Sequence, residues 1–201
     1  MFRKIKAFFH FLRRAKWDLD GGRFHHRQAM LAPIPGYIGF TLRYRLYKKY
    51  LKSLGEETLF YEGIYIRNPQ NLSIGHHCAM GVDNAFQAAG YLTIGDYVVF
   101  GPGVKVWTSN HIFSDPNKPI LEQGSEFKEV VIGDDTWVAA NVFIMPGARI
   151  GKGCVISAGA VVGAKTYKDY SILAGNPARV IGFRNQLASQ ESTSSAPPKE
   201  E

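Results

Sequence analysis

The sequence predicts an all-β solenoid, in which short parallel strands stack coil upon coil around a triangular core. Three observations lead to this prediction. Along much of the chain an aliphatic residue recurs every six positions, a small or medium-sized residue follows it after four positions, and glycine often follows it directly. A period of six matches neither a helix nor simple strand alternation, so each six-residue unit is expected to form one short strand and one turn.

The repeat is clearest between residues 132 and 166. The aliphatic positions there are Ile132, Val138, Ile144, Ile150, Ile156 and Val162, and the small positions are Thr136, Val142, Ala148, Cys154, Ala160 and Thr166. The same frame recurs upstream at Ile94, Phe100 and Val106, and more weakly at Ile74, Met80 and Phe86. Because three units complete one coil of 18 residues, the sequence predicts four coils with these residues pointing inward.

The two cysteines, Cys78 and Cys154, each lie four residues after an aliphatic position. We therefore expect buried, reduced thiols rather than a disulfide framework. With 45% hydrophobic residues the chain can bury a sizeable core, and no apolar run in the sequence is long enough to span a bilayer. These features favour a cytoplasmic globular protein.

This pattern resembles that of the hexapeptide-repeat acyltransferases, in particular the galactoside-, maltose- and polysaccharide-type O-acetyltransferases. The resemblance covers about residues 66–183 and implies a left-handed parallel β-helix, a hand that the usual right-handed crossover would not predict. It further implies a homotrimer with active sites between neighbouring β-helices, and acetyl-CoA as the acyl donor. The expected β-helix domain is 56–184, and a disordered tail rich in Ser and Pro follows at 185–201.

The regular spacing stops after His111, where a polar stretch with two prolines begins. We expect residues 112–130 to form a loop that leaves the coil, and loops on rigid scaffolds often carry function. In the resembled enzymes the catalytic base is a histidine that ends a coil 16 residues after an Ile-Gly glycine, and His111 follows Gly95 by 16 residues. The resemblance therefore implies that His111 is the general base and that a loop glutamate, best matched by Glu126, orients it.

The resemblance also suggests residues that hold the acyl donor. Ala140 and Ala158 are one coil apart on the same edge, where small side chains would let the pantetheine arm of acetyl-CoA approach the backbone. Lys165 and Arg179 match basic residues near the CoA phosphates, where a cation is physically reasonable.

For the acceptor, Trp137 matches a tryptophan that lines the active site of the resembled enzymes. Their acceptor-binding asparagine has no counterpart at its aligned position near Gly81, which argues against a simple galactoside acceptor. Asp83 and Asn84 lie close to that position and are expected to contact a different sugar.

Basic charge is concentrated in the N-terminal segment 1–55, where helices are predicted. Residues 1–54 contain 13 Lys and Arg but only two Asp, whereas the net charge of the whole chain is +7. Residues 1–17 fit an amphipathic basic helix and residues 39–55 a second helix. Two roles stay open: the helices cap the first coil, or the first helix lies on the anionic inner face of a membrane. Nucleic-acid binding is disfavoured, because no recognition motif accompanies the charge.

Together these features predict an acetyl-CoA-dependent O-acetyltransferase that acts by direct transfer on a sugar hydroxyl of a polysaccharide or a lipid-linked glycan precursor. Two alternatives stay open: an N-acetyltransferase of a nucleotide-linked amino sugar, and a non-catalytic hexapeptide-repeat scaffold. No metal is expected. A zinc site like that of the γ-class carbonic anhydrases needs three histidines, and the coils contain only the adjacent pair His76 and His77, besides His111.

Overall fold

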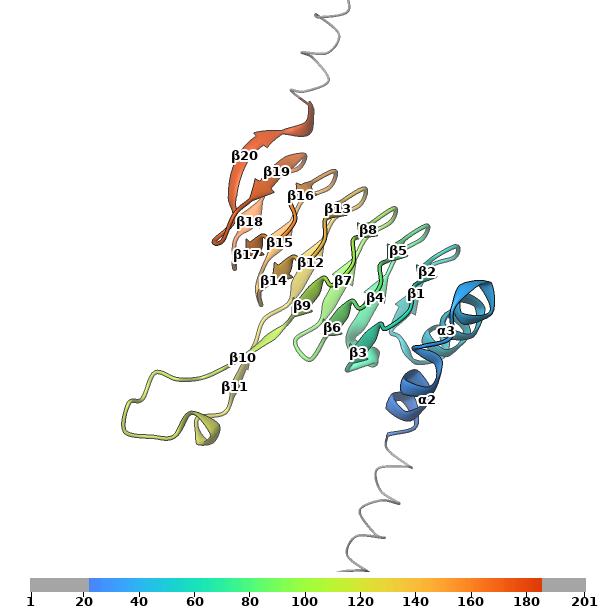
Figure 1. Ribbon diagram of the computed structural model, residues 1–201. Coiled ribbons are helices and arrows are strands. Elements are labelled where there is room, and N and C mark those ends of the chain that lie inside the picture. The colour runs from blue at the N-terminus through green and yellow to red at the C-terminus, as the bar shows by residue number, and fades with distance from the viewer. Residues whose placement is uncertain (1–21, 186–201) are drawn as a thin grey trace, which may run out of the picture.

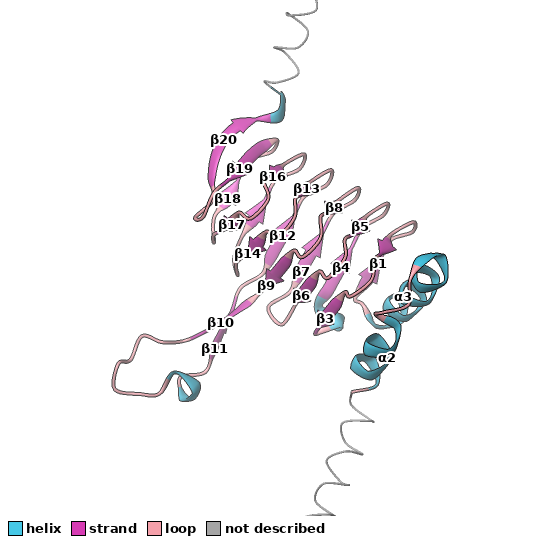
Figure 2. Ribbon diagram, in the orientation of Figure 1, coloured by secondary structure: helices cyan, strands magenta, loops and turns pink. Residues whose placement is uncertain are grey.

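The computed structural model describes residues 22–185 as a solenoid of stacked coils with two helices at one end (Figure 1). Short strands alternate with turns along the whole solenoid (Figure 2). Strands at equal positions in successive coils pair in parallel and form three sheets, so the predicted all-β solenoid is confirmed. The predicted helix at 1–17 lies outside the described residues, as do residues 186–201 of the predicted tail.

We call the three sheets face A, face B and face C. Face A contains β1 (Ser53–Leu54), β4 (Leu72–Ile74), β7 (Leu92–Ile94), β12 (Val130–Ile132), β15 (Arg149–Ile150) and β18 (Thr166–Tyr167). Face B contains β2 (Leu59–Phe60), β5 (Ala79–Met80), β8 (Val99–Phe100), β13 (Trp137–Val138), β16 (Val155–Ile156), β19 (Ser171–Ala174) and the antiparallel β20 (Arg179–Phe183). Face C contains β3 (Tyr65–Arg67), β6 (Ala85–Gln87), β9 (Lys105–Trp107), β14 (Phe143–Ile144) and β17 (Val161–Val162). The chain visits the faces in the order A, B, C, and its turns therefore form an A–B edge, a B–C edge and a C–A edge.

The inward positions of successive coils stack directly on one another. On face A, Ile94 pairs with Ile74 on one side and with Ile132 on the other. All twelve residues predicted to point inward between positions 74 and 162 are buried. Removing one such side chain from water contributes about 1.5–3 kcal/mol, so these columns form the hydrophobic core.

Two details of the predicted repeat were wrong. The solenoid is longer than four coils, because an earlier coil and an incomplete last one also bury hydrophobic residues. Their inward positions are Leu54, Phe60 and Ile66 in the first coil and Tyr167 and Leu173 in the last. Thr166 is exposed rather than inward, because the step from Val162 to the next inward residue, Tyr167, is five residues instead of six.

Cys78 and Cys154 are free and buried, as predicted. Burial raises the pKa of both thiols above its ordinary value. The Cys78 thiol lies 3.1 Å from the Gly95 carbonyl oxygen of the next coil, to which it donates. Both cysteines therefore act as small core residues and not as nucleophiles.

Two helices close the first coil, which has no strand beneath it: α2 (Arg23–Leu31), which the repeat analysis did not predict, and α3 (Gly36–Tyr50), which lies where a helix was predicted at 39–55. Their side chains bond the backbone groups that β1, β2 and β3 leave unpaired. On face A, Lys48 donates to the Leu54 carbonyl and Tyr44 to the Gly55 carbonyl. On face B, Arg43 donates to the Phe60 carbonyl. On face C, the side-chain amide of Gln28 bonds both the carbonyl and the N–H of Ile66. This arrangement protects the end of the solenoid from pairing with another strand.

Arg43 is completely buried at the centre of this cap. Its Nε donates to the Phe60 carbonyl at 2.8 Å, and its Nη1 donates to the carbonyls of Leu31 and Ile34 at 3.0 and 2.7 Å. Burial lowers the pKa of the guanidinium, and the nearby Glu62 carboxylate, 3.9 Å away, opposes this effect. Arg43 therefore joins α3, the turn after α2 and face B.

Replacing this arginine tests the cap. In Arg43→Met several buried carbonyl oxygens lose their donor, so we expect the free energy of unfolding to fall by about 3 kcal/mol, as measured by urea denaturation. Arg45→Met removes an exposed arginine from the same helix and should change it by less than about 0.5 kcal/mol. Equal effects of the two substitutions would contradict the capping role of Arg43.

Candidate active site

The predicted loop at 112–130 leaves the solenoid at the C–A edge and projects from it as a β-ribbon (Figure 1). The ribbon pairs β10 (Ser109–His111) with β11 (Ser125–Phe127) in antiparallel register, and the short η2 (Ile120–Glu122) lies near its tip. Its base is anchored by the buried Thr108, whose hydroxyl donates to the Gln87 carbonyl at 2.8 Å. The ribbon therefore leaves the coil from a fixed point.

His111 ends β10 with an exposed side chain, and no described residue forms a hydrogen bond with its ring. It lies opposite Ser125, whereas Glu126 lies opposite Asn110. Because directly opposed residues of an antiparallel pair point to the same side, His111 and Glu126 point to opposite sides of the ribbon. The Glu126 carboxylate instead forms an ion pair of 2.9 Å with Lys128. The resemblance implies that Glu126 orients His111, but within one chain the structure does not bring the two side chains together.

The two alanines predicted to hold acetyl-CoA lie together on the B–C edge. Ala140 follows β13 and Ala158 follows β16, and the Gly159 N–H donates to the Ala140 carbonyl at 2.9 Å. Both line one open groove of about 620 Å³, which we call the alanine groove. The other residues of this groove are Gly101, Pro102, Trp137, Ala139, Val155, Ile156 and Ser157. The lining is small and mostly apolar, so an extended thin substrate can lie against the backbone here.

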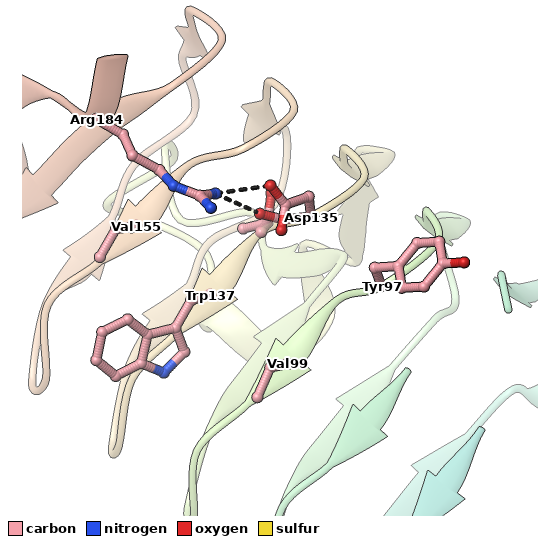
Figure 3. Close-up of a pocket in the computed structure, with 7 residues that line it drawn as sticks. Tyr97, Val99, Asp135, Trp137, Val155 and Arg184 are labelled. Carbon is pink, nitrogen blue, oxygen red and sulfur yellow. Dashed lines mark hydrogen bonds and ion pairs between the residues drawn. The ribbon is translucent and has the colours of Figure 1, made fainter. Parts of the chain in front are cut away.

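Trp137 points outward from face B, between Val99 and Val155 of the adjacent coils (Figure 3). Its side chain is 53% exposed and lines both the alanine groove and a second hollow of about 360 Å³. Arg184 lies at that second hollow and donates to the Asp135 carboxylate at 2.7 Å (Figure 3). The repeat pattern did not point to Arg184, because β20, which brings this residue to the hollow, interrupts the repeat.

Asp83 and Asn84 form the turn between β5 and β6, also on the B–C edge. Asp83 is exposed and adopts a left-handed backbone conformation with φ of 56°. Asn84 is completely buried, and its side-chain amide donates to the Gly101 carbonyl of the next coil at 2.8 Å. Within this chain Asn84 therefore supports the solenoid and is not accessible to an acceptor, whereas Asp83 is.

The two cations predicted for the CoA phosphates lie in different places. Lys165 is exposed in the turn between β17 and β18, on the C–A edge and away from the alanines. Arg179 begins β20, and the preceding Ala178 N–H donates to the Val161 carbonyl, just past the turn that contains Ala158. Arg179 therefore lies at the C-terminal end of the B–C edge, beyond the two alanines.

The site residues are thus divided between two edges of one chain. His111, Glu126 and Lys165 lie on the C–A edge, whereas Asp83, Ala140 and Ala158 lie on the B–C edge. Face C separates these two groups. A single copy therefore does not assemble the histidine with the alanine groove.

Comparison with known proteins agrees with this architecture. The family model described as bacterial transferase hexapeptide (six repeats) matches residues 129–164. The chain is 35% identical to a probable acetyltransferase of Mycobacterium tuberculosis over 57% of this chain and 38% of that relative. It is 38% identical to the galactoside O-acetyltransferase of Lactococcus lactis over 43% and 41%, and 29% identical to a putative colanic acid biosynthesis acetyltransferase of Escherichia coli over 65% and 69%. The chain thus covers about two-fifths of the length of the first two relatives.

Solved structures show the same fold. A galactoside acetyltransferase in complex with coenzyme A has a TM-score of 0.74 at 25% identity, and the match covers 83% of this chain and 82% of that one. A hexapeptide-repeat acetyltransferase from Vibrio cholerae, complexed with acetyl coenzyme A, has a TM-score of 0.73 at 23% identity over 81% and 85%. The chain therefore has the left-handed parallel β-helix fold, and its repeats match the hexapeptide model over residues 129–164. The predicted resemblance to the hexapeptide-repeat acyltransferases is confirmed.

Two further features concern only residues 22–185. In this part of the chain no three His, Cys, Asp or Glu side chains lie close enough together to hold a metal ion. None of its helices combines the length and the apolar character needed to cross a bilayer.

Proposed function

We propose that the chain is an acetyl-CoA-dependent O-acetyltransferase that acts on a sugar hydroxyl of a polysaccharide or a lipid-linked glycan precursor. The observation that carries this proposal is the position of His111, an exposed imidazole without a side-chain partner in the described chain, on a ribbon anchored to a rigid solenoid. The alanine groove supplies the matching surface for a CoA thioester. Relatives named as galactoside and colanic acid acetyltransferases support a sugar acceptor.

In the proposed reaction His111 takes the proton of the acceptor hydroxyl as its oxygen attacks the thioester carbonyl of acetyl-CoA. The resulting tetrahedral oxyanion is stabilised by a hydrogen-bond donor, for which a backbone N–H suffices. Its collapse forms the acetyl ester and breaks the bond to sulfur. The imidazolium of His111 then returns the proton to the CoA thiolate, so that no acyl-enzyme forms.

The division of the site between two edges supports a homotrimer with active sites between neighbouring copies. The ribbon carries large hydrophobic side chains that one copy leaves exposed: Ile112, Phe113, Ile120, Leu121 and Phe127. In the proposed trimer these side chains pack on the next copy, and the His111 of one copy then faces Asp83 and the alanine groove of its neighbour. Exposed apolar groups on a projecting arm are typical of such contacts.

The base role of His111 is tested by substitution. We expect His111→Ala to lower turnover by about 10²–10⁴-fold, measured as CoA release with a panel of sugar acceptors, with acetyl-CoA binding and the oligomeric state kept. His77→Ala is the matched control, because His77 is a half-exposed histidine on the A–B edge that pairs with Glu57. Turnover that survives His111→Ala would rule out the mechanism. If the unmodified chain and the His77→Ala control both turn over no acceptor, the scaffold alternative stands.

Donor binding is tested separately, because it requires no knowledge of the acceptor. Ala158→Leu places a bulky side chain in the groove and Arg179→Ala removes a cation at its end, so each should weaken acetyl-CoA binding about tenfold or more in calorimetry. Ala29→Leu, at an exposed position of α2, is the control and should leave the affinity unchanged. Unaltered binding in Ala158→Leu would place the donor elsewhere.

We also propose that residues 1–17 attach the protein to an anionic membrane surface. This segment carries six Lys and Arg, each worth about 1 kcal/mol near such a surface, and apolar residues at helical spacing. Deleting it should reduce co-sedimentation with vesicles that contain phosphatidylglycerol, and the intact chain should not bind vesicles of phosphatidylcholine alone. Equal sedimentation of the intact and shortened chains would remove the membrane role.

A further inference from the structure

The hollow of about 360 Å³ that Trp137 borders lies on face B, between the alanine groove and the A–B edge (Figure 3). We call it the face B hollow. Its lining residues are Tyr97, Val99, Asp135, Thr136, Trp137, Val155 and Arg184. Small-molecule sites occupy about 300–1,000 Å³ and combine apolar or aromatic walls with a few polar groups, as this hollow does. None of the roles proposed above involves Tyr97, Asp135 or Arg184.

Two aromatic rings and two valines form the apolar part of the hollow. Val99 and Val155 pair with Trp137 from the adjacent coils, so their outward side chains lie on either side of its ring. The Tyr97 ring stacks on His77, with 4.7 Å between ring centres and 13° between ring planes, which fixes its orientation. Rings held in this way offer a large contact area, and a ligand orders few side chains when it binds them.

Arg184 and Asp135 form the polar part of the hollow. The Arg184 Nη1 donates to the Asp135 carboxylate at 2.7 Å and to the Asp135 carbonyl at 3.5 Å. The backbone N–H of Arg184 donates to the Tyr170 carbonyl at 2.8 Å, which holds the base of this side chain in place. Within residues 22–185, the N–H groups on Nε and Nη2 of Arg184 and the Oδ1 atom of Asp135 have no partner. Donors and an acceptor therefore lie side by side.

This combination favours a neutral ligand with neighbouring hydroxyl groups. The charges of Arg184 and Asp135 compensate each other, so an anion or a cation gains little attraction here. An apolar chain would cover the pair without bonding it, which is unfavourable. A sugar ring satisfies both parts of the hollow: each hydroxyl can donate to Asp135 or accept from Arg184, and its C–H face can pack on the electron-rich face of Trp137.

The face B hollow is continuous with the alanine groove. Trp137 and Val155 line both of them. Asp135 in the hollow is five residues from Ala140 in the groove, a distance of at most about 18 Å along an extended strand. A glycan that presents one hydroxyl at the alanine groove can therefore place a neighbouring sugar unit in the hollow.

From these observations we propose that the face B hollow is a subsite for a second sugar unit of the glycan acceptor. The ring of this unit packs on Trp137, and its hydroxyls bond Arg184 and Asp135. The proposal rests on the proposed acetyl transfer, because it extends the acceptor site beyond the sugar that is acetylated. It makes the hollow a determinant of specificity: a single sugar at the alanine groove does not reach the pair, whereas an oligosaccharide does.

The experiment measures sugar binding to the full chain by calorimetry without acetyl-CoA. The probes are the tetrasaccharides of galactose, glucose and N-acetylglucosamine and the corresponding monosaccharides. The intact chain should bind one tetrasaccharide at least about tenfold more tightly than its monosaccharide, and Arg184→Met should remove most of this difference. Asp135→Asn keeps an acceptor oxygen and tolerates the left-handed backbone at this position, so it should weaken binding less.

Arg149→Met is the matched control. Arg149 forms the same kind of pair with Glu129, at 2.8 Å, but on face A. Its substitution should change the affinity for the tetrasaccharide less than about twofold. The acetyl-CoA affinity of Arg184→Met should equal that of the intact chain, because the donor lies in the alanine groove.

Three results would overturn the proposal. The first is that no tetrasaccharide binds more tightly than its monosaccharide. The second is an equal loss in Arg184→Met and Arg149→Met. The third is a loss of acetyl-CoA affinity in Arg184→Met with sugar binding unchanged, which would assign the hollow to the donor. Failure of the acetyl-transfer proposal gives a different result: the tetrasaccharide binds through Arg184, but no acceptor is acetylated.

Discussion

Parallel pairing of each strand with the same strand of the next coil is the constraint on which the rest of the structure depends. It makes each coil repeat the one before it, so inward side chains stack in columns and turns stack in edges. It also leaves no room beside some turns. A Cβ atom added to Gly75 would lie 2.6 Å from the backbone of Gly95 in the next coil, which explains why glycine follows the aliphatic residue there.

Such a ladder leaves unpaired backbone groups at its ends, and this chain closes the N-terminal end with side chains instead of a further strand. The side chains that form this closure are Arg43, Lys48, Tyr44 and Gln28, and two of the four are cationic. Other cations on the same helices, such as Lys49, remain exposed. Capping and attraction of anions, which the sequence presented as alternatives, are therefore compatible roles of one segment.

The core could be predicted from the sequence because a single rule places it: one inward residue in every six. The rule fails where the edges change length. The step from Ile66 to Ile74, where η1 is inserted, is eight residues, as is the step from Phe86 to Ile94, so the six-residue rule does not continue across the C–A edge at these places. The cap was invisible for another reason, since Gln28 is 38 residues from its partner Ile66 and only the folded chain brings them together. Likewise, side chains along the ribbon alternate between its two sides, and this alternation separates Glu126 from His111. Which residues share a side depends on a pairing register that the sequence does not specify.

The same ladder determines how the candidate site can be completed. Its hydrogen bonds hold the B–C edge and the C–A edge apart in each copy, so no local movement within a coil brings Ala158 to His111. Among the described residues, the ribbon is the segment that projects sideways from the stacked coils, and it starts from the buried anchor at Thr108. Each copy thus offers one ribbon and one groove on different surfaces, so the contact between copies in the trimer that we propose is head-to-tail. A head-to-tail contact must close into a ring to leave no ribbon uncovered, and three copies around one axis are the closed arrangement that we propose.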